Sequence, residues 1–115
     1  MCNALSPEKA VMWTLLFEGA PDPELRAEHF THESYRRWFA VMAQLMQDGE
    51  AVNEASMVKR SEASGHAMDR LEKRALQRML RVPPPPRVRA NRSLLVQALA
   101  DRLLGKRVHI ERLIN

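Results

Sequence analysis

Several features that define common secreted and membrane proteins are missing from this sequence of 115 residues. Cys2 is the only cysteine, so no disulfide can form within the chain, which is typical of a reducing compartment. No apolar run approaches the roughly 18 residues that a membrane-spanning helix needs. Residues 1–7 lack the basic and apolar regions of a signal peptide. We therefore expect a cytoplasmic protein without a membrane partner.

The motifs of nucleotide, metal and catalytic sites are also missing. The only Gly-Lys pair, Gly105-Lys106, is followed by an arginine, and Ala100 stands where a phosphate-binding loop has its first glycine. His29 and His32 are close in the sequence but lack the further ligands that a zinc site requires. No residues form a recognisable set of acid, base and nucleophile. The sequence therefore predicts no catalytic residue, no metal and no cofactor, and a protein that is not an enzyme.

Residues that favour strands are few. Aromatic residues make up only 5% of the sequence and β-branched residues are sparse, whereas helix-forming alanine, leucine, methionine, glutamate and arginine dominate. The apolar residues recur at helical spacing rather than in alternation. We predict an all-α protein, with a compact bundle of about five short helices followed by a long C-terminal helix.

Capping residues and apolar periodicity place the expected helices. They run from Pro7 to Gly19, around Glu24–Glu28, from Thr31 to Gly49, from Asn53 to Gly65, from about His66 to Arg81, and from about Asn91 onward. The third helix has the clearest apolar face, formed by Tyr35, Trp38, Phe39, Met42, Leu45 and Met46. The inward face expected for the fifth helix is formed by Met68, Leu71, Ala75, Leu76, Met79 and Leu80.

Four consecutive prolines divide the sequence into a globular part and a terminal helix. Pro83–Pro86 cannot continue a helix and favour stiff polyproline II. We predict a helical globular domain at 1–82, a proline-rich spacer at 83–90 and a long protruding helix at 91–115. Because nothing follows that helix to cover its apolar side, we expect it to bind another copy of the chain. The predicted interface residues are Leu95, Leu99, Leu103, Ile110, Leu113 and Ile114.

Charge is unevenly divided along the chain. Residues 1–65 hold 6 Lys/Arg and 10 Asp/Glu, a net −4, whereas residues 66–115 hold 12 and 4, a net +8. The basic half indicates solvated helix faces, an acidic partner or nucleic acid. Because no aromatic residue follows Phe39, stacking on single-stranded bases is not expected, and nucleic acid is a secondary prediction. The candidate contacts are Arg74, Arg78, Arg81, Arg87, Arg89 and Arg92.

An ordered set of residues carries a family resemblance. It begins with the helical residues Glu8, Val11, Met12, Leu15 and Leu16. It continues without a gap through the run Phe30–Asn53, which contains Tyr35-Arg-Arg-Trp-Phe-Ala-Val-Met-Ala-Gln-Leu45 and then Gly49-Glu-Ala-Val-Asn53. This set resembles the N-terminal domain of DnaB-type replicative helicases, and Pro83–Pro86 followed by a long helix is similar to that family in order.

The resemblance implies a non-catalytic module for oligomerisation and partner docking in DNA replication. Such a domain is a small helical globule followed by a helical hairpin, of which 91–115 would be the first half. Self-association into dimers or a ring-shaped collar supports the helicase hexamer, and the collar docks primase or a helicase loader within the primosome. The helicase ATPase domain would be a further partner if the chain is part of a longer protein. Two alternatives stay open: a small basic DNA-binding regulator, and a stand-alone mobile-element protein that binds a host helicase.

Overall fold

The computed structural model describes residues 6–102, which fold into six α-helices and one short 3-10 helix with no strand among them. In chain order the elements are α1 (Pro7–Glu18), η1 (Ala27–His29), α2 (Glu33–Gln47), α3 (Glu54–Ala63), α4 (Arg70–Arg81), α5 (Pro86–Ala90) and α6 (Arg92–Arg102). The predicted all-α class is confirmed, and the helix expected around Glu24–Glu28 is the 3-10 turn η1.

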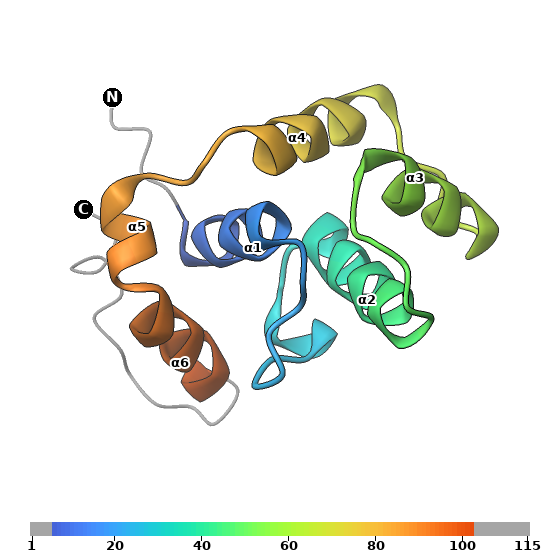
Figure 1. The fold of residues 1–115 in the computed structure, drawn as a ribbon. Coiled ribbons are helices and arrows are strands. Elements are labelled where there is room, and N and C mark those ends of the chain that lie inside the picture. Colours follow the sequence, from blue (N-terminus) through green and yellow to red (C-terminus); the bar gives the residue numbers. More distant parts are fainter. Residues whose placement is uncertain (1–5, 103–115) are drawn as a thin grey trace.

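Helix α1 is the central element, and α2, α4, α5 and α6 all contact it (Figure 1). Most of its circumference is buried, and its buried apolar residues are Ala10, Val11, Met12, Leu15 and Leu16. A helix that is apolar nearly all round requires cover on several sides. The arrangement of the later helices around α1 meets that requirement.

The predicted end signals of α1 and α3 are confirmed. Ser6 Oγ accepts a hydrogen bond of 3.1 Å from the Lys9 amide, and Gly19 closes α1 with a φ of 79°. Asn53 and Ser56 form a reciprocal capping box, each side chain accepting from the other's amide at 2.9 and 3.0 Å. These ends are set by local residues, which is why the sequence located them.

The predicted apolar faces are partly correct. On α2 the buried members are Tyr35, Trp38, Phe39, Met42 and Leu45, whereas Met46 is exposed. On α4, Leu76 and Met79 are buried as predicted, but Leu71 is 74% exposed and Ala75 is also exposed. The predicted face was too broad: Leu71 lies about 140° around the helix from Leu76 at 3.6 residues per turn.

The proline segment differs from the predicted spacer. Pro86–Ala90 form α5, in which Pro86 takes the first helical position, where its missing amide hydrogen leaves no bond unmade. Between α4 and α5 only residues 82–85 lie outside the helices, whereas the predicted spacer was 83–90. Val88 is fully buried and attaches α5 to the core.

The predicted protruding helix requires a correction. Its described part, α6, lies against α1 and is covered by it (Figure 1). Leu95 and Leu99 are 1% and 0% exposed, so both belong to the core of the chain itself and do not face a second copy. The prediction failed because it treated the apolar side of this helix as uncovered, although α1 supplies the cover. The other predicted interface residues, which lie outside the described range, are Leu103, Ile110, Leu113 and Ile114.

Candidate functional site

A buried carboxylate joins the start of α1 to the start of α2. Glu8 is 7% exposed and accepts hydrogen bonds from the amides of Thr31 at 2.7 Å and His32 at 2.9 Å, and from the Thr31 hydroxyl. The first amides of a helix lack partners within the helix, and a negative group is favourable there. Thr31, predicted as the cap of α2, is thus a donor to Glu8, and the N-cap position belongs to His32.

Tyr35 lies beside this carboxylate in the first turns of α2. It is 8% exposed, and its ring stacks on His32 with centroids 4.2 Å apart. Burial, and then the negative charge of Glu8, raise the pKa of Tyr35 above its ordinary value. A carboxylate that already accepts three hydrogen bonds serves as a cap, so we interpret this cluster as a structural junction.

A second polar connection joins α6 to the end of α1. Arg92 donates from Nε and Nη2 to the two carboxylate oxygens of Glu18 at 2.6 and 2.8 Å, and from Nη1 to Asp22 at 3.0 Å. This two-pronged geometry is the strong form of an arginine–carboxylate pair. Hydrogen bonding to Glu18 is the main cause of a raised pKa at Arg92, which keeps the guanidinium charged.

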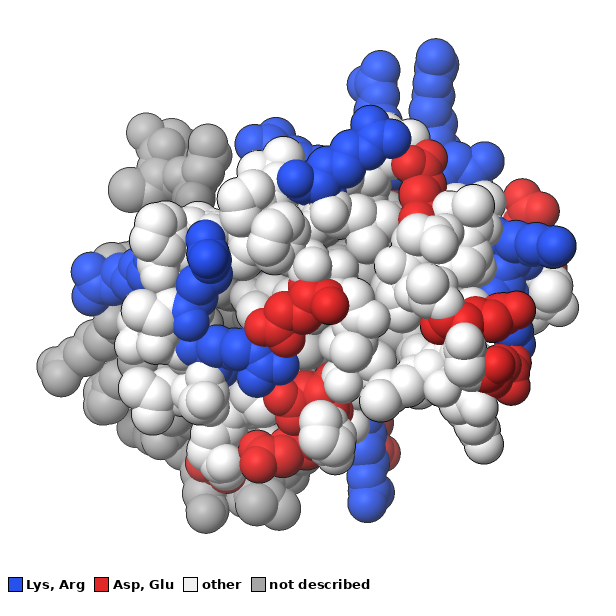
Figure 2. Space-filling view, viewed as in Figure 1, with Lys and Arg blue, Asp and Glu red and all other residues white. Residues whose placement is uncertain are grey.

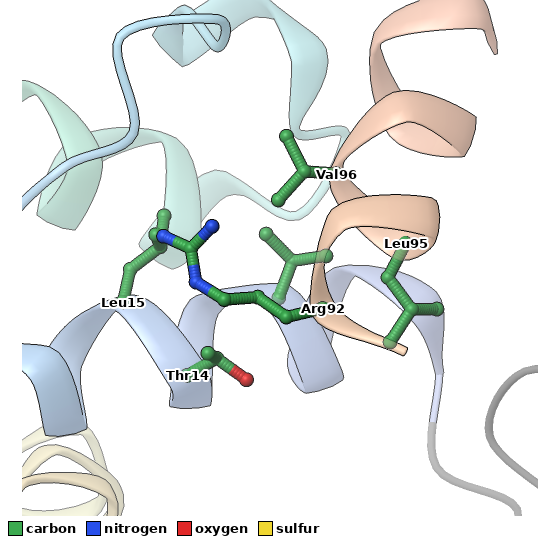
Figure 3. A pocket seen from close by; sticks show the side chains of 6 residues that line it. Thr14, Leu15, Arg92, Leu95 and Val96 are labelled. Atoms are coloured by element: carbon green, nitrogen blue, oxygen red, sulfur yellow. The ribbon is translucent and has the colours of Figure 1, made fainter. Parts of the chain in front are cut away.

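The apolar part of the same junction lies beside Arg92. Figure 3 shows Arg92 extending from the start of α6 across α1, past Thr14 toward Leu15, with Leu95 and Val96 on the α6 side. The buried Thr14 hydroxyl donates to the Ala10 carbonyl at 2.8 Å, so its polar group is satisfied within α1. Arg92 was predicted as a nucleic-acid contact; its guanidinium is instead held by Glu18 and by Asp22.

The surface next to this junction contains the clearest candidate for a binding site. Phe17, in the last turn of α1, is 41% exposed and lines two hollows of about 370 and 490 Å³, which it shares with Glu18. The first is lined by Thr14, Phe17, Glu18, Pro84, Arg89 and Arg92. The second is lined by Leu16, Phe17, Glu18, Gly19, Val52, Asn53, Glu54, Leu80 and Arg81. We call these two depressions, together with the Phe17 side chain, the Phe17 surface.

The position of the Phe17 surface is fixed by contacts between distant segments. Trp13 Nε1, one helical turn before Phe17, donates to the Val82 carbonyl at 2.7 Å and so holds the end of α4 near α1. Val82 is 42% exposed. On the other side, Glu54 accepts from Gln77 at 2.6 Å and attaches the start of α3 to α4. An exposed aromatic ring that lines hollows with charged rims is typical of a protein-binding surface.

The Phe17 surface was not predicted from the sequence. Phe17 follows directly after Leu15 and Leu16 in the sequence and continues their apolar run. On a helix, however, it lies about 100° around the axis from Leu16, which carries it away from the core. The available signal was an aromatic residue two positions before Gly19, which ends the helix.

The predicted arginine contacts are distributed over three elements. Arg74, Arg78 and Arg81 lie on the exposed side of α4, and Figure 2 shows basic side chains gathered along the edge of the molecule where Figure 1 places α4. Arg87 and Arg89 are exposed on α5, and Arg89 lines the first hollow. The structure thus groups the three α4 residues and separates them from the others.

His29 and His32 each contact a neighbouring residue of the chain. His29 Nδ1 accepts a hydrogen bond of 2.8 Å from the Arg26 amide, and His32 stacks on Tyr35. Within residues 6–102, no group of three or more histidine, cysteine, aspartate or glutamate side chains is placed to hold a metal ion. No helix in that range has the length and apolar character required to cross a membrane.

Comparison of the chain with protein families, with curated proteins and with solved structures found no match.

Proposed function

We propose that this chain is a non-catalytic module for oligomerisation and partner docking, similar to the N-terminal collar domain of a DnaB-type replicative helicase. In this role it supports hexamer assembly and binds primase or a helicase loader during DNA replication. The observation that carries the proposal is the run Phe30–Asn53, because its residues match the family pattern in order and without a gap.

The positions of these residues in the fold support the proposal. Phe30, Trp38 and Leu45 are at most 1% exposed and form core contacts. Gly49 has a φ of 72°, which suits the turn after α2, and Asn53 caps α3. The matched residues are thus the ones that specify a helix, a turn and a second helix. The proposal infers the docking function from the sequence resemblance of these fold-specifying residues.

The Phe17 surface supports the docking part of the proposal. A partly exposed aromatic side chain, rimmed by the Glu18–Arg92 and Glu54–Arg81 pairs, combines an apolar contact with charges that orient a partner. We assign primase or loader contact to this surface.

Self-association requires a different set of residues from the one first predicted. Because Leu95 and Leu99 are core residues, we assign self-contact to the apolar residues of segment 103–115. The four of them that belong to the predicted interface are Leu103, Ile110, Leu113 and Ile114. Their apolar character in a short basic segment is the sequence feature that supports the assignment.

Binding to purified DnaB-type helicase, primase and helicase loader, measured by surface plasmon resonance on the immobilised full chain, tests the docking role. We expect saturable binding to at least one of the three, weakened about tenfold or more by Phe17→Ala. Met46→Ala is the matched control, because it also truncates an exposed apolar side chain, on α2. Absence of binding to all three proteins would overturn the proposal.

A further inference from the structure

Helix α4 carries a row of arginines on the side that faces away from the core. Arg70, Arg74 and Arg78 are spaced four residues apart, and Arg81 follows three residues later. At 3.6 residues per turn all four fall within a sector about 80° wide. Leu76 and Met79, the buried residues of α4, lie on the opposite side of the helix. The charge therefore forms one continuous stripe.

The stripe is not neutralised by the rest of the described chain. Among residues 6–102, Arg70, Arg74 and Arg78 form no ion pair, and Arg81 approaches Glu54 at 3.6 Å with 74% of its side chain exposed. Such exposed pairs contribute little and exchange easily. The acidic residues of the same helix are elsewhere: Asp69 caps the helix by accepting from the Glu72 amide at 2.8 Å, and Glu72 lies toward the buried side.

The dimensions of the stripe suit a nucleic-acid backbone. From Arg70 to Arg81 the helix rises about 16 Å at 1.5 Å per residue. One strand of duplex DNA presents a phosphate about every 3.4 Å along its axis, so roughly five phosphates lie within that length. Arginine is well suited to phosphate oxygens because its planar guanidinium donates in a fork.

We propose that the α4 stripe binds the phosphodiester backbone of double-stranded DNA without reading its sequence. Duplex is favoured over single-stranded nucleic acid because α4 itself contains no aromatic residue on which an unpaired base stacks. The inference goes beyond the docking role. The stripe shares Arg81 with the rim of the Phe17 surface, whereas Arg70, Arg74 and Arg78 do not line that surface. It gives the module a second contact, to the DNA on which its partner works.

Fluorescence anisotropy with a short labelled duplex, the matching single strand and labelled poly-glutamate tests the proposal on the full chain. We expect the duplex to bind most tightly and to lose about a hundredfold in affinity between about 50 and 200 mM salt, as about four phosphate contacts predict. The double variant Arg74→Ala and Arg78→Ala should weaken duplex binding at least about tenfold and reduce the salt slope by about two. Alanine favours helices, so the variant should keep its circular dichroism spectrum.

The matched control is the double variant Lys9→Ala and Arg26→Ala, which removes the same charge from exposed side chains outside α4. Its duplex binding should stay within about twofold of the parent chain, since the phosphate contacts are unchanged. Four outcomes would overturn the proposal: no duplex binding at about 50 mM salt, equal loss in both double variants, equal or tighter binding of the single strand, or equal or tighter binding of poly-glutamate. The last of these would indicate an acidic protein partner.

Discussion

Arg92, at the start of α6, donates two hydrogen bonds of 2.6 and 2.8 Å to Glu18, at the end of α1. The two residues are 74 positions apart in the sequence. This contact, together with the apolar packing of Leu95 and Val96 against Val11 and Leu15, holds α6 against α1. The sequence predicted a protruding helix from residue 91 onward. Its described part, α6, instead packs into the core.

The Glu18–Arg92 pair should make a small but measurable contribution to stability. Both side chains are about one third exposed, so solvent screening limits their coupling to about 1 kcal/mol. A double-mutant cycle with Glu18→Gln and Arg92→Lys, measured by urea unfolding, should give this value. The coupling should shrink in high salt. A coupling energy of zero at low salt would show that the pair does not hold α6.

Two leucines of α6 should differ strongly in how much their truncation destabilises the fold. Leu99 is fully buried, so Leu99→Ala should lower the free energy of unfolding by about 2–5 kcal/mol through lost burial and the cavity left behind. Leu94 is 57% exposed, and Leu94→Ala should change stability by less than about 0.5 kcal/mol. Thermal unfolding followed by circular dichroism measures both. Equal tolerance of the two changes would contradict the packing of α6 on α1.

Removing the Glu8 carboxylate should destabilise the junction of α1 and α2. Glu8→Ala leaves the amides of Thr31 and His32 without their acceptor, which should cost about 2–3 kcal/mol for lost hydrogen bonds to a charged group. Thr31→Val removes only the hydroxyl donor and should cost about 1 kcal/mol. Urea unfolding followed by tryptophan fluorescence compares them. If Glu8→Ala were no more damaging than Thr31→Val, the capping role would be wrong.

Tyr35 should make the fold sensitive to alkaline pH. Its pKa is raised above 10.0 in the folded chain, so the unfolded chain releases this proton first as pH rises. The contribution of neutral Tyr35 is therefore complete below pH 10.0 and is lost as pH rises through the folded pKa. Because Tyr35 is the only tyrosine, absorption by tyrosinate reports its ionisation directly.

The control for that titration is Tyr35→Phe, which keeps the ring and removes the ionisable group. The melting temperature of the parent chain should fall more steeply above pH 10.0 than that of Tyr35→Phe. Parallel curves, or an ordinary tyrosine titration, would show that Tyr35 is not buried beside Glu8.

Local signals in the sequence predicted the helix ends, whereas the surroundings of α6 depended on tertiary contacts. Ser6 with Pro7, and Asn53 with its following turn, act through bonds to residues at most three positions away. The cover of α6 comes instead from α1, where Val11 and Thr14 line the contact with Leu95. A sequence signal for it existed, because α1 is apolar nearly all round and so requires several neighbours.

The candidate surfaces were predictable to different degrees. The arginine stripe of α4 follows from spacing, since four residues at helical intervals share a face wherever the helix packs. The sequence did not predict that Arg92 lies apart from this stripe. Arg92 is held by an ion pair with Glu18, which is distant in the sequence. The Phe17 surface was not predictable either, since its hollows are lined by residues from α1, α3, α4, α5 and α6 and from the segments between helices.

We propose that this chain assembles through segment 103–115 rather than through Leu95 and Leu99, which are buried in the chain itself. Light scattering on the full chain at micromolar concentration tests it most directly. We predict the mass of a dimer or larger ring for the parent chain and for Leu71→Asp, an exposed leucine on α4. We predict a monomer with unchanged helicity for Ile110→Asp combined with Leu113→Asp. A parent chain that is monomeric, or an assembly that the double variant leaves intact, would contradict the claim.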